Sequence, residues 1–198
     1  MDSRLAKKFA RALLLSAAAL LSGVGSPVLA AHPSQAAQFP QAAYASPAAR
    51  ASRAVLVGTV SRVVDGDTLV VQLSTGPIKV RLYGIDAPEH NQPGGFESAA
   101  TLRSLVAGKQ VSLEPVNQDR YSRLVAKVFQ GRLNVNAEMV ARGEAWVYRH
   151  YLAKADRPWC GLETDARGRR LGLWKRREVI PPWAFRHHTR DFSIPPCP

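Results

Sequence analysis

Four short segments of this 198-residue sequence supply carboxylate and arginine side chains that could do chemistry together. The segments are residues 65–68 (DGDT), 81–89 (RLYGIDAPE), 119–123 (DRYSR) and 135–148 (VNAEMVARGEAWVY). Carboxylates are hard oxygen ligands for a hard divalent cation, and a guanidinium group can bind two phosphate oxygens at once. Hydrolysis of a phosphodiester needs an in-line arrangement and stabilisation of negative charge on the phosphorus oxygens. The segments together therefore predict chemistry on phosphodiester bonds.

Five side chains in these segments are candidates for that chemistry. Asp67 and Asp86 are candidate metal ligands, whereas Arg81 and Arg123 are candidates for binding phosphate oxygens. Glu89 is a carboxylate that can orient or deprotonate a water molecule. Each segment alone has an ordinary structural explanation, such as a hairpin turn at Asp-Gly or a helix-capping loop at Asp-Ala-Pro-Glu. Only the set, in this order and spacing, favours a catalytic site.

The segments resemble the staphylococcal nuclease (thermonuclease) family over roughly residues 54–175. The likeness is greatest to exported bacterial members that end in GLW and PPW, here residues 172–174 and 181–183. The resemblance implies an α+β, mainly β fold, a five-stranded oligonucleotide/oligosaccharide-binding (OB) barrel with about three helices. It also implies calcium-dependent endonucleolytic cleavage of DNA and RNA at the P–O5′ bond, which leaves 3′-phosphate ends.

The resemblance further implies a Ca²⁺ site. Asp67 matches the second aspartate of the family's DGDT motif, and Asp86 matches the aspartate of a DTPE-like motif. Both would ligate the cation through their carboxylates. Ala87 stands where the family often has threonine, and its backbone carbonyl would be the third protein ligand, which the change of side chain preserves.

Arg81, Glu89 and Arg123 match the three catalytic residues of the family. Arg81 would bind the phosphate, Arg123 would neutralise charge that develops in the transition state, and Glu89 would act as general base or orient water. Two departures concern this set. Ser122 replaces a glycine of many members beside Arg123, and the loop 90–95 is shorter and less lysine-rich than in the best-known member.

Nucleic-acid-binding residues follow from the same resemblance. Tyr121 matches the nucleotide-stacking tyrosine of the family, and Arg120 keeps the basic character beside it. The second stacking tyrosine corresponds to Tyr148 or Tyr151, and both are retained as binding candidates. The alternative for these two side chains is core packing next to Trp146.

Two other protein classes explain part of the sequence. A non-catalytic binding module on the same barrel fits the fold and the basic charge, but it leaves the complete set of acidic and arginine residues without a purpose. An exported structural or envelope-binding protein fits the N-terminus but not that set. Digestion of DNA with calcium present and then chelated separates the three classes. The sequence does not fix calcium over magnesium, nor DNA over RNA, because oxygen ligands suit both ions and backbone contacts suit both polymers.

The elements that must position these side chains follow residue 53. β-Branched and alternating runs predict five strands, at residues 54–64, 67–73, 78–85, 111–116 and 123–129. The first three form a meander, with a turn at Asp65-Gly66. Apolar residues at helical spacing predict helices at 96–106, 135–141 and 152–170. Pro158 must lie in the first turn of the last helix or interrupt it. We expect the tail after Trp174 to be irregular but packed.

Charge and cysteines restrict the environment and the partners. The chain has a formal net charge of +12, and residues 54–198 hold 21 basic and 14 acidic residues, a net +7. Such a charge favours polyanionic partners, here DNA and RNA. Cys160 and Cys197 are the two cysteines. An even number in an exported protein favours a disulfide, and the lack of CxxC or HExxH patterns argues against zinc.

The N-terminus has the pattern of an export signal. Basic residues precede the uncharged run at 12–21, and small residues at 28–30 predict cleavage after Ala30, with an uncleaved anchor as the alternative. Residues 31–53, rich in Ala, Pro, Gln and Ser, predict a disordered linker. We therefore expect a signal peptide at 1–30 and a folded domain at 54–198. The mature protein is expected to be secreted or periplasmic, monomeric, and without stable membrane insertion.

Overall fold

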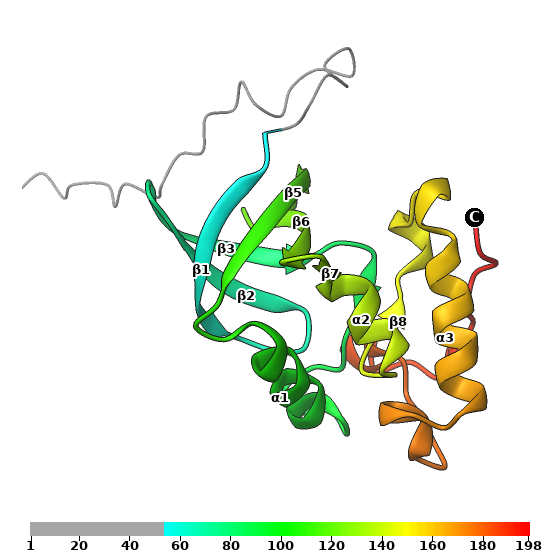
Figure 1. The fold of residues 1–198 in the computed structure, drawn as a ribbon. Helices are drawn as coiled ribbons and strands as arrows, with labels where there is room; N and C mark the ends of the chain where they lie inside the picture. The colour runs from blue at the N-terminus through cyan, green and yellow to red at the C-terminus, as the bar shows by residue number, and fades with distance from the viewer. Residues whose placement is uncertain (1–53) are drawn as a thin grey trace, which may run out of the picture. The chain divides into compact units, whose positions relative to one another are not determined.

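The computed structural model describes residues 54–198. The predicted signal peptide (1–30) and linker (31–53) lie outside the described residues. Figure 1 shows the barrel strands on one side and α2, β8 and α3 beside them, with α1 below the barrel. Within residues 54–198, no helix has both the length and the apolar character needed to cross a membrane.

Five strands close into a barrel. Their bounds are β1 Leu56–Val63, β2 Thr68–Leu73, β3 Gly76–Leu82, β5 Gln110–Gln118 and β6 Leu124–Gln130. Antiparallel pairing runs in the order β3-β2-β1-β5-β6, and a parallel pairing between β3 and β6 closes the sheet. The predicted OB barrel is thus confirmed, with its five strands close to the predicted ranges. Closure leaves these strands no free edges.

The barrel interior is filled by alternating residues of the strands. Val60, Leu69, Val71, Val80 and Leu113 are at most 1% exposed. Side chains of a strand point to opposite faces in turn, so every second residue enters this core and its neighbours face outward. The alternation that predicted the strands is therefore the pattern that packs them.

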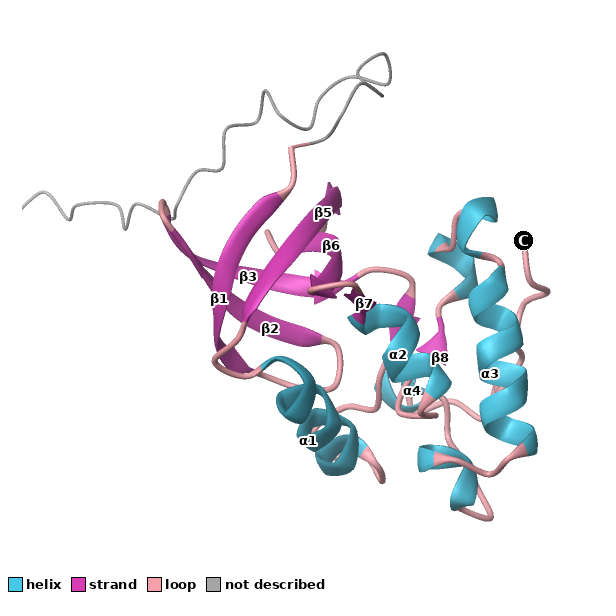
Figure 2. Cartoon of the chain, in the orientation of Figure 1, coloured by secondary structure: helices cyan, strands magenta, loops and turns pink. Residues whose placement is uncertain are grey.

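The three predicted helices are present, and a fourth is added (Figure 2). Their bounds are α1 Gly95–Val106, α2 Val135–Ala141, α3 Pro158–Gly168 and α4 Pro182–His187. The expectation of an irregular tail was wrong at α4, which Pro182 begins at a position where no N–H is needed. The long helix predicted at 152–170 is also divided. Its first part is a 3-10 turn at Lys154–Asp156, and α3 begins at Pro158.

The third predicted strand, 78–85, is divided as well. β3 ends at Leu82, and Gly84 turns the chain with a φ of 71°. A side chain at Gly84 would lie 2.9 Å from the ring of Trp159, so both the backbone angle and the space favour glycine. The chain then forms β4, Ile85–Asp86, which pairs with β8, Trp146–Val147, in a separate two-stranded sheet. This sheet holds Asp86 within hydrogen-bond distance of Arg81 in β3.

Short elements complete the chain. They are β7 Leu133–Asn134, which pairs with β6, and 3-10 turns at Arg149–Tyr151 and Gly172–Lys175. Asn136, in the first turn of α2, is fully buried. Its side chain accepts a hydrogen bond from Val128 N at 2.8 Å and donates to the carbonyls of Tyr83, at 2.8 Å, and Ala126, at 3.2 Å. Buried backbone groups left unpaired are costly, so these bonds attach α2 to the end of β3 and to β6.

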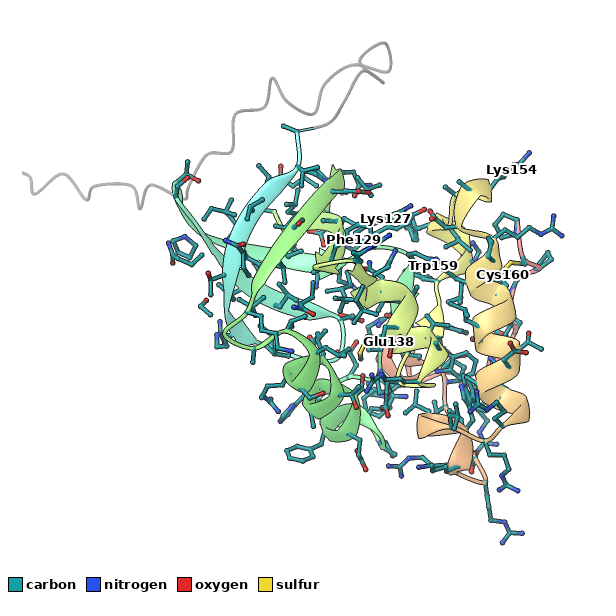
Figure 3. The ribbon with its side chains drawn as sticks, viewed as in Figure 1. Lys127, Phe129, Glu138, Lys154, Trp159 and Cys160 are labelled. Atoms are coloured by element: carbon teal, nitrogen blue, oxygen red, sulfur yellow. A yellow bond between two sulfur atoms is a disulfide. The ribbon has the colours of Figure 1, made fainter. Side chains whose placement is uncertain are left out.

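Aromatic and cationic side chains attach α3 and the chain that follows it to the barrel. Trp146 packs edge-on against Trp174 and Trp183, with centroids 4.6 and 5.2 Å apart. Lys127 of β6 donates to Asp156 at 2.5 Å and lies 5.8 Å from the ring centroid of Trp159 (Figure 3). The Trp cluster and this cation thus connect the barrel to α3 and to the tail.

The structure joins Cys160 of α3 to Cys197 by a disulfide. The bond closes a loop with a sequence separation of 37 residues. Because such a cross-link restricts the unfolded chain, replacing both cysteines by serine should lower the free energy of unfolding by up to about 4 kcal/mol. Denaturant unfolding of oxidised protein and of the double variant measures the difference. Equal unfolding free energies, or two free thiols in the non-reduced protein, would contradict the expectation.

Candidate active site

Two buried aspartates share one arginine. Asp67 directly precedes β2, Asp86 ends β4, and their exposed fractions are 6% and 0%. Arg81 of β3 pairs in register with Thr68, which brings its side chain to the end of β2. The guanidinium donates to Asp86 Oδ1 at 2.9 Å and forms an ion pair with Asp67 Oδ2. The structure therefore brings both candidate metal ligands and a candidate phosphate-binding arginine to one point.

One backbone N–H and one hydroxyl fix the Asp67 carboxylate. Ala87 N donates to Asp67 Oδ2 at 2.8 Å, and Thr68 Oγ1 donates to Asp67 Oδ1 at 3.0 Å. The turn before Asp67 packs so closely on α1 that a side chain at Gly66 would clash with Ser98. The third predicted ligand, Ala87, thus lies directly beside Asp67.

Burial changes the electrostatics of this turn. Asp65 Oδ1 accepts a hydrogen bond from Asp67 N at 3.0 Å. Burial, followed by the negative charge of Asp67, raises the pKa of Asp65 to about 7. Burial also raises the pKa of Asp86, although hydrogen bonds from Arg186 and the charge of Arg81 oppose this rise. Carboxylates so crowded and desolvated favour an additional positive charge among them. Asp65 was present in the DGDT motif, but sequence reasoning gave it no role.

Arg123 is held at the same edge by Asp119. Asp119 Oδ2 accepts from Arg123 Nε at 2.7 Å, while Oδ1 accepts from the backbone N–H groups of Tyr121, at 2.9 Å, and Arg123, at 3.0 Å. Arg123 Nη1 is 3.5 Å from Thr68 Oγ1, which bonds Asp67. Sequence reasoning missed the role of Asp119, although an aspartate that opens a turn commonly accepts from N–H groups further along.

Ser122 adopts the left-handed conformation that glycine commonly takes in such turns. Its φ is 60°, and its N–H donates to Asp119 O at 3.0 Å. Asp119 N in turn donates to Arg123 O at 3.0 Å. The turn that presents Arg123 therefore forms in spite of the serine, at a conformational cost of about 1–2 kcal/mol relative to glycine.

Glu89 receives an arginine that the sequence analysis did not identify. Arg186 of α4 donates from Nη1 to Glu89 Oε1 at 2.9 Å and to Asp86 Oδ1 at 3.1 Å, and from Nη2 to Asp86 Oδ2 at 2.8 Å. Burial alone would lower the pKa of Arg186, but its bonds to Asp86 and Glu89 raise it above the ordinary value. Arg186 follows Asp86 by 100 positions, and no pattern near it in the sequence indicates the contact.

The four candidate nucleic-acid-binding residues lie in two groups. Tyr121 is 65% exposed, and the guanidinium carbons of Arg120 and Arg123 lie 4.9 and 5.5 Å from its ring centroid. Tyr148 is half-buried and packs edge-on against exposed Tyr151, with centroids 4.9 Å apart. Burial and the charge of Asp86 raise the pKa of Tyr148, so this ring lies within electrostatic range of the carboxylates.

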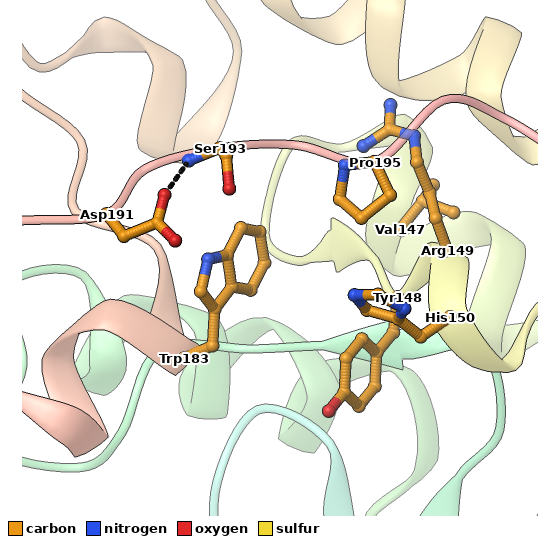
Figure 4. Close-up of a pocket in the computed structure, with 8 residues that line it drawn as sticks. All are labelled: Val147, Tyr148, Arg149, His150, Trp183, Asp191, Ser193 and Pro195. Carbon is orange, nitrogen blue, oxygen red and sulfur yellow. Dashed lines mark hydrogen bonds between the residues drawn. The ribbon is translucent and has the colours of Figure 1, made fainter. Parts of the chain in front are cut away.

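A cavity of about 220 Å³ lies beside Tyr148 (Figure 4). One side is formed by β8 and the following turn, and the other by the C-terminal segment. Its lining residues are Val147, Tyr148, Arg149, His150, Trp183, Asp191, Ser193 and Pro195. Trp146 contacts Trp174 and Trp183. Tyr148 packs on Tyr151 and lines this cavity together with Trp183, a member of the tryptophan cluster.

The possible metal ligands are few. Within residues 54–198, no group of three or more His, Cys, Asp or Glu side chains has the geometry to hold a metal ion. A cation at Asp67 and Asp86 would therefore depend on the two carboxylates, a backbone carbonyl, and oxygen atoms from water or substrate. Such a donor set suits a hard cation in an open site.

Comparisons with known proteins agree on one family. Residues 79–176 match the sequence model of the family described as staphylococcal nuclease homologue. An uncharacterized endonuclease of Escherichia coli O157:H7 is 42% identical over 131 residues, which cover 66% of this chain and 84% of that protein. The micrococcal nuclease of Shigella flexneri is 36% identical over 143 residues, which cover 68% and 82%. An uncharacterized endonuclease of Haemophilus influenzae is 39% identical over 133 residues, which cover 66% and 73%.

The hydrogen bonds of Asp119 predict a dependence of stability on pH. Burial raises the pKa of Asp119, but bonds from the backbone and side chain of Arg123 and from Tyr121 N outweigh it, and the pKa is lowered. Stability from a lowered carboxyl pKa is present above the unfolded-state pKa and is lost as pH falls through the folded-state value. Asp119→Asn should therefore lose less unfolding free energy than the unmodified protein between about pH 5 and pH 2. Denaturant titrations across this range test it, and parallel pH profiles would contradict it.

Proposed function

We propose that this chain, which belongs to the staphylococcal nuclease family, is a calcium-dependent endonuclease that hydrolyses phosphodiester bonds of DNA and RNA and leaves 3′-phosphate ends. One observation carries the proposal: the convergence of Asp67 and Asp86 on the guanidinium of Arg81, with Arg123 and Glu89 at the same edge. A binding module needs no such set of clustered charges. The matched relatives named endonuclease or nuclease support the same reaction class.

The charge balance supports a divalent cation. Five carboxylates face three guanidinium groups at this edge. The carboxylates belong to Asp65, Asp67, Asp86, Glu89 and Asp119, and the guanidinium groups to Arg81, Arg123 and Arg186. When all five carboxylates are ionised, an excess of two negative charges remains, which fits one divalent cation. Asp67, Asp86 and the carbonyl of Ala87 would hold Ca²⁺, with water or substrate in the remaining positions. When bound, the cation supplies positive charge for the phosphate oxygens and lowers the pKa of bound water.

The arginines and Glu89 would act on the phosphate and the water. Arg81 is already directed at the point where the two aspartates meet, so it can bind a phosphate oxygen there. Arg123 has its Nε fixed by Asp119, and its remaining N–H groups can stabilise charge that develops in the transition state. Glu89 would orient or deprotonate the attacking water.

The substrate-binding surface supports polymers of either sugar type. Tyr121 with Arg120, and Tyr148 with Tyr151, offer rings on which bases can stack. Stacking and phosphate contacts depend little on base identity or on the sugar. The net charge of +7 over residues 54–198 strengthens attraction to either polymer.

Removal of Asp67 should remove the metal dependence together with cleavage. In Asp67→Ala the cation loses one of its two carboxylates, so calcium-dependent cleavage of an oligonucleotide should be abolished while circular dichroism shows an unchanged fold. Asp165→Ala, which changes an exposed carboxylate of α3, is the matched control and should keep full activity. Cleavage retained by chelator-treated Asp67→Ala protein would overturn the assignment.

Loss of Arg123 should affect the rate more than binding. If this guanidinium stabilises charge that develops on the transferring phosphate, Arg123→Ala should lower kcat by about 10³–10⁵-fold. KM should change far less, because the contact strengthens only as the charge forms. Arg120→Ala, which removes the neighbouring exposed arginine, should mainly raise KM. Single-turnover cleavage and separate binding measurements distinguish the two, and near-normal turnover by Arg123→Ala would favour a non-catalytic module.

A further inference from the structure

The C-terminal segment is attached to the loop that carries the candidate site. Gln92, only 4% exposed, accepts a hydrogen bond from Glu89 N at 3.2 Å and donates to Ile180 O at 2.6 Å. Trp183 of α4 packs on Trp146, whose backbone pairs with Asp86 in the β4–β8 sheet. Two contacts that do not involve Arg186 therefore place α4 beside Asp86 and Glu89.

Arg186 has the contacts of a fixed side chain, although 35% of it is exposed. Its guanidinium makes three hydrogen bonds, two to the fully buried carboxylate of Asp86 and one to Glu89. Ordering an arginine costs up to about 2 kcal/mol of side-chain entropy. Charge-assisted bonds to a buried carboxylate offset this cost better than an exposed pair such as Arg176–Glu97. The geometry thus fixes Arg186 between two acidic residues of the site.

We propose that Arg186 is a positioning residue that holds the Glu89 carboxylate in place by bridging it to Asp86, a role that rests on the function proposed above. Within residues 54–198, the Glu89 carboxylate accepts one hydrogen bond, and its donor is Arg186. Arg186 lies beyond the residues matched by the family model, 79–176. The α4 segment therefore completes the site from outside that region.

The contacts of the two arginines favour this role over phosphate binding. Arg81 contacts Asp67 Oδ2 and Asp86 Oδ1, and its transfer to a phosphate would remove one donor from each of these oxygens. Arg186 shares Asp86 Oδ1 with Arg81, but its bonds to Asp86 Oδ2 and Glu89 Oε1 do not involve Arg81 and can persist after that transfer. A group that orients water must be fixed closely, since a displacement of about 1 Å can cost 10²-fold in rate.

Arg186→Gln should lower kcat by about 10–100-fold, the usual loss when a group that hydrogen-bonds a metal-ligating carboxylate, here that of Asp86, is removed. KM should change little, because Arg186 would not contact the substrate. Arg186→Lys keeps the positive charge but cannot bridge both carboxylates equally. Its kcat should therefore lie between those of the unmodified protein and Arg186→Gln. Arg176→Gln, which breaks an exposed pair in the same C-terminal segment, is the matched control and should behave as the unmodified protein.

A double variant tests whether the effect passes through Glu89. In a Glu89→Gln background, Arg186→Gln should cause little further loss of rate, because the group that Arg186 positions is already changed. Calorimetric titration of calcium and binding of an uncleavable oligonucleotide give readouts besides activity. Oligonucleotide affinity should be unchanged, and calcium affinity unchanged or higher, since a competing positive charge leaves Asp86.

Each contrary result has a definite meaning. An equal loss of rate in the Glu89→Gln background, with weaker oligonucleotide binding, would make Arg186 a phosphate ligand and overturn the proposal. Faster cleavage with tighter calcium binding would make Arg186 a competitor of the cation and would also overturn the proposal.

The inference and the proposed function can fail separately. If the unmodified protein is active and Arg186→Gln has the same activity, the inference alone is refuted. An inactive unmodified protein would refute the proposed function and the inference with it. Should Arg186→Gln lower the unfolding temperature, Arg186→Lys carries the same comparisons below that temperature.

Discussion

The site depends on the charge interaction between Asp67, Asp86 and the guanidinium they share. Two carboxylates this buried would repel each other and lose their hydration, so a positive charge between them is required. The parallel β3–β6 pairing closes the barrel at the residues that include Arg81, and the turn at Gly84 then returns the chain with Asp86. Barrel closure and charge compensation are thus met by the same few residues of β3 and β4.

The C-terminal third of the chain completes the edge of the barrel where these charges lie. β8 supplies the partner strand of Asp86, and the tryptophans around Trp146 bury the sheet formed by β4 and β8. The disulfide ties the last residues to α3, while Gln92 ties the start of α4 to the Glu89 loop. Packing in this region therefore determines the position of acidic groups that the barrel alone would leave partly unsupported.

The sequence predicts what is local and periodic. Strand alternation predicted the strands because half of each strand enters one core, whereas the barrel that they form was implied by the resemblance to the nuclease family. The motifs singled out Asp67, Arg81, Asp86, Glu89 and Arg123 as a set. It missed β4 and β8, since two-residue strands have no periodicity to detect. It also missed Arg186, because a contact across 100 positions depends on how the Trp146 cluster places α4 rather than on residues near Arg186. The turn aspartate Asp119 lay within a recognised motif, and its role emerged only from the three bonds it accepts.

The three arginines of the site share one physical device. Each is held by a carboxylate before any substrate is present: Arg81 by the aspartate pair, Arg123 by Asp119 and Arg186 by Asp86 with Glu89. A free arginine loses considerable rotamer entropy when it binds a ligand, and a side chain already fixed by folding loses less. The carboxylate partners differ in what they leave available. Asp119 fixes Nε of Arg123, whose Nη1 lies 3.5 Å from the hydroxyl of Thr68, whereas Arg81 and Arg186 each use both terminal nitrogens on carboxylates. Side chains of one chemical type at one edge of the barrel thereby differ in how much of each guanidinium group is already committed to the protein itself.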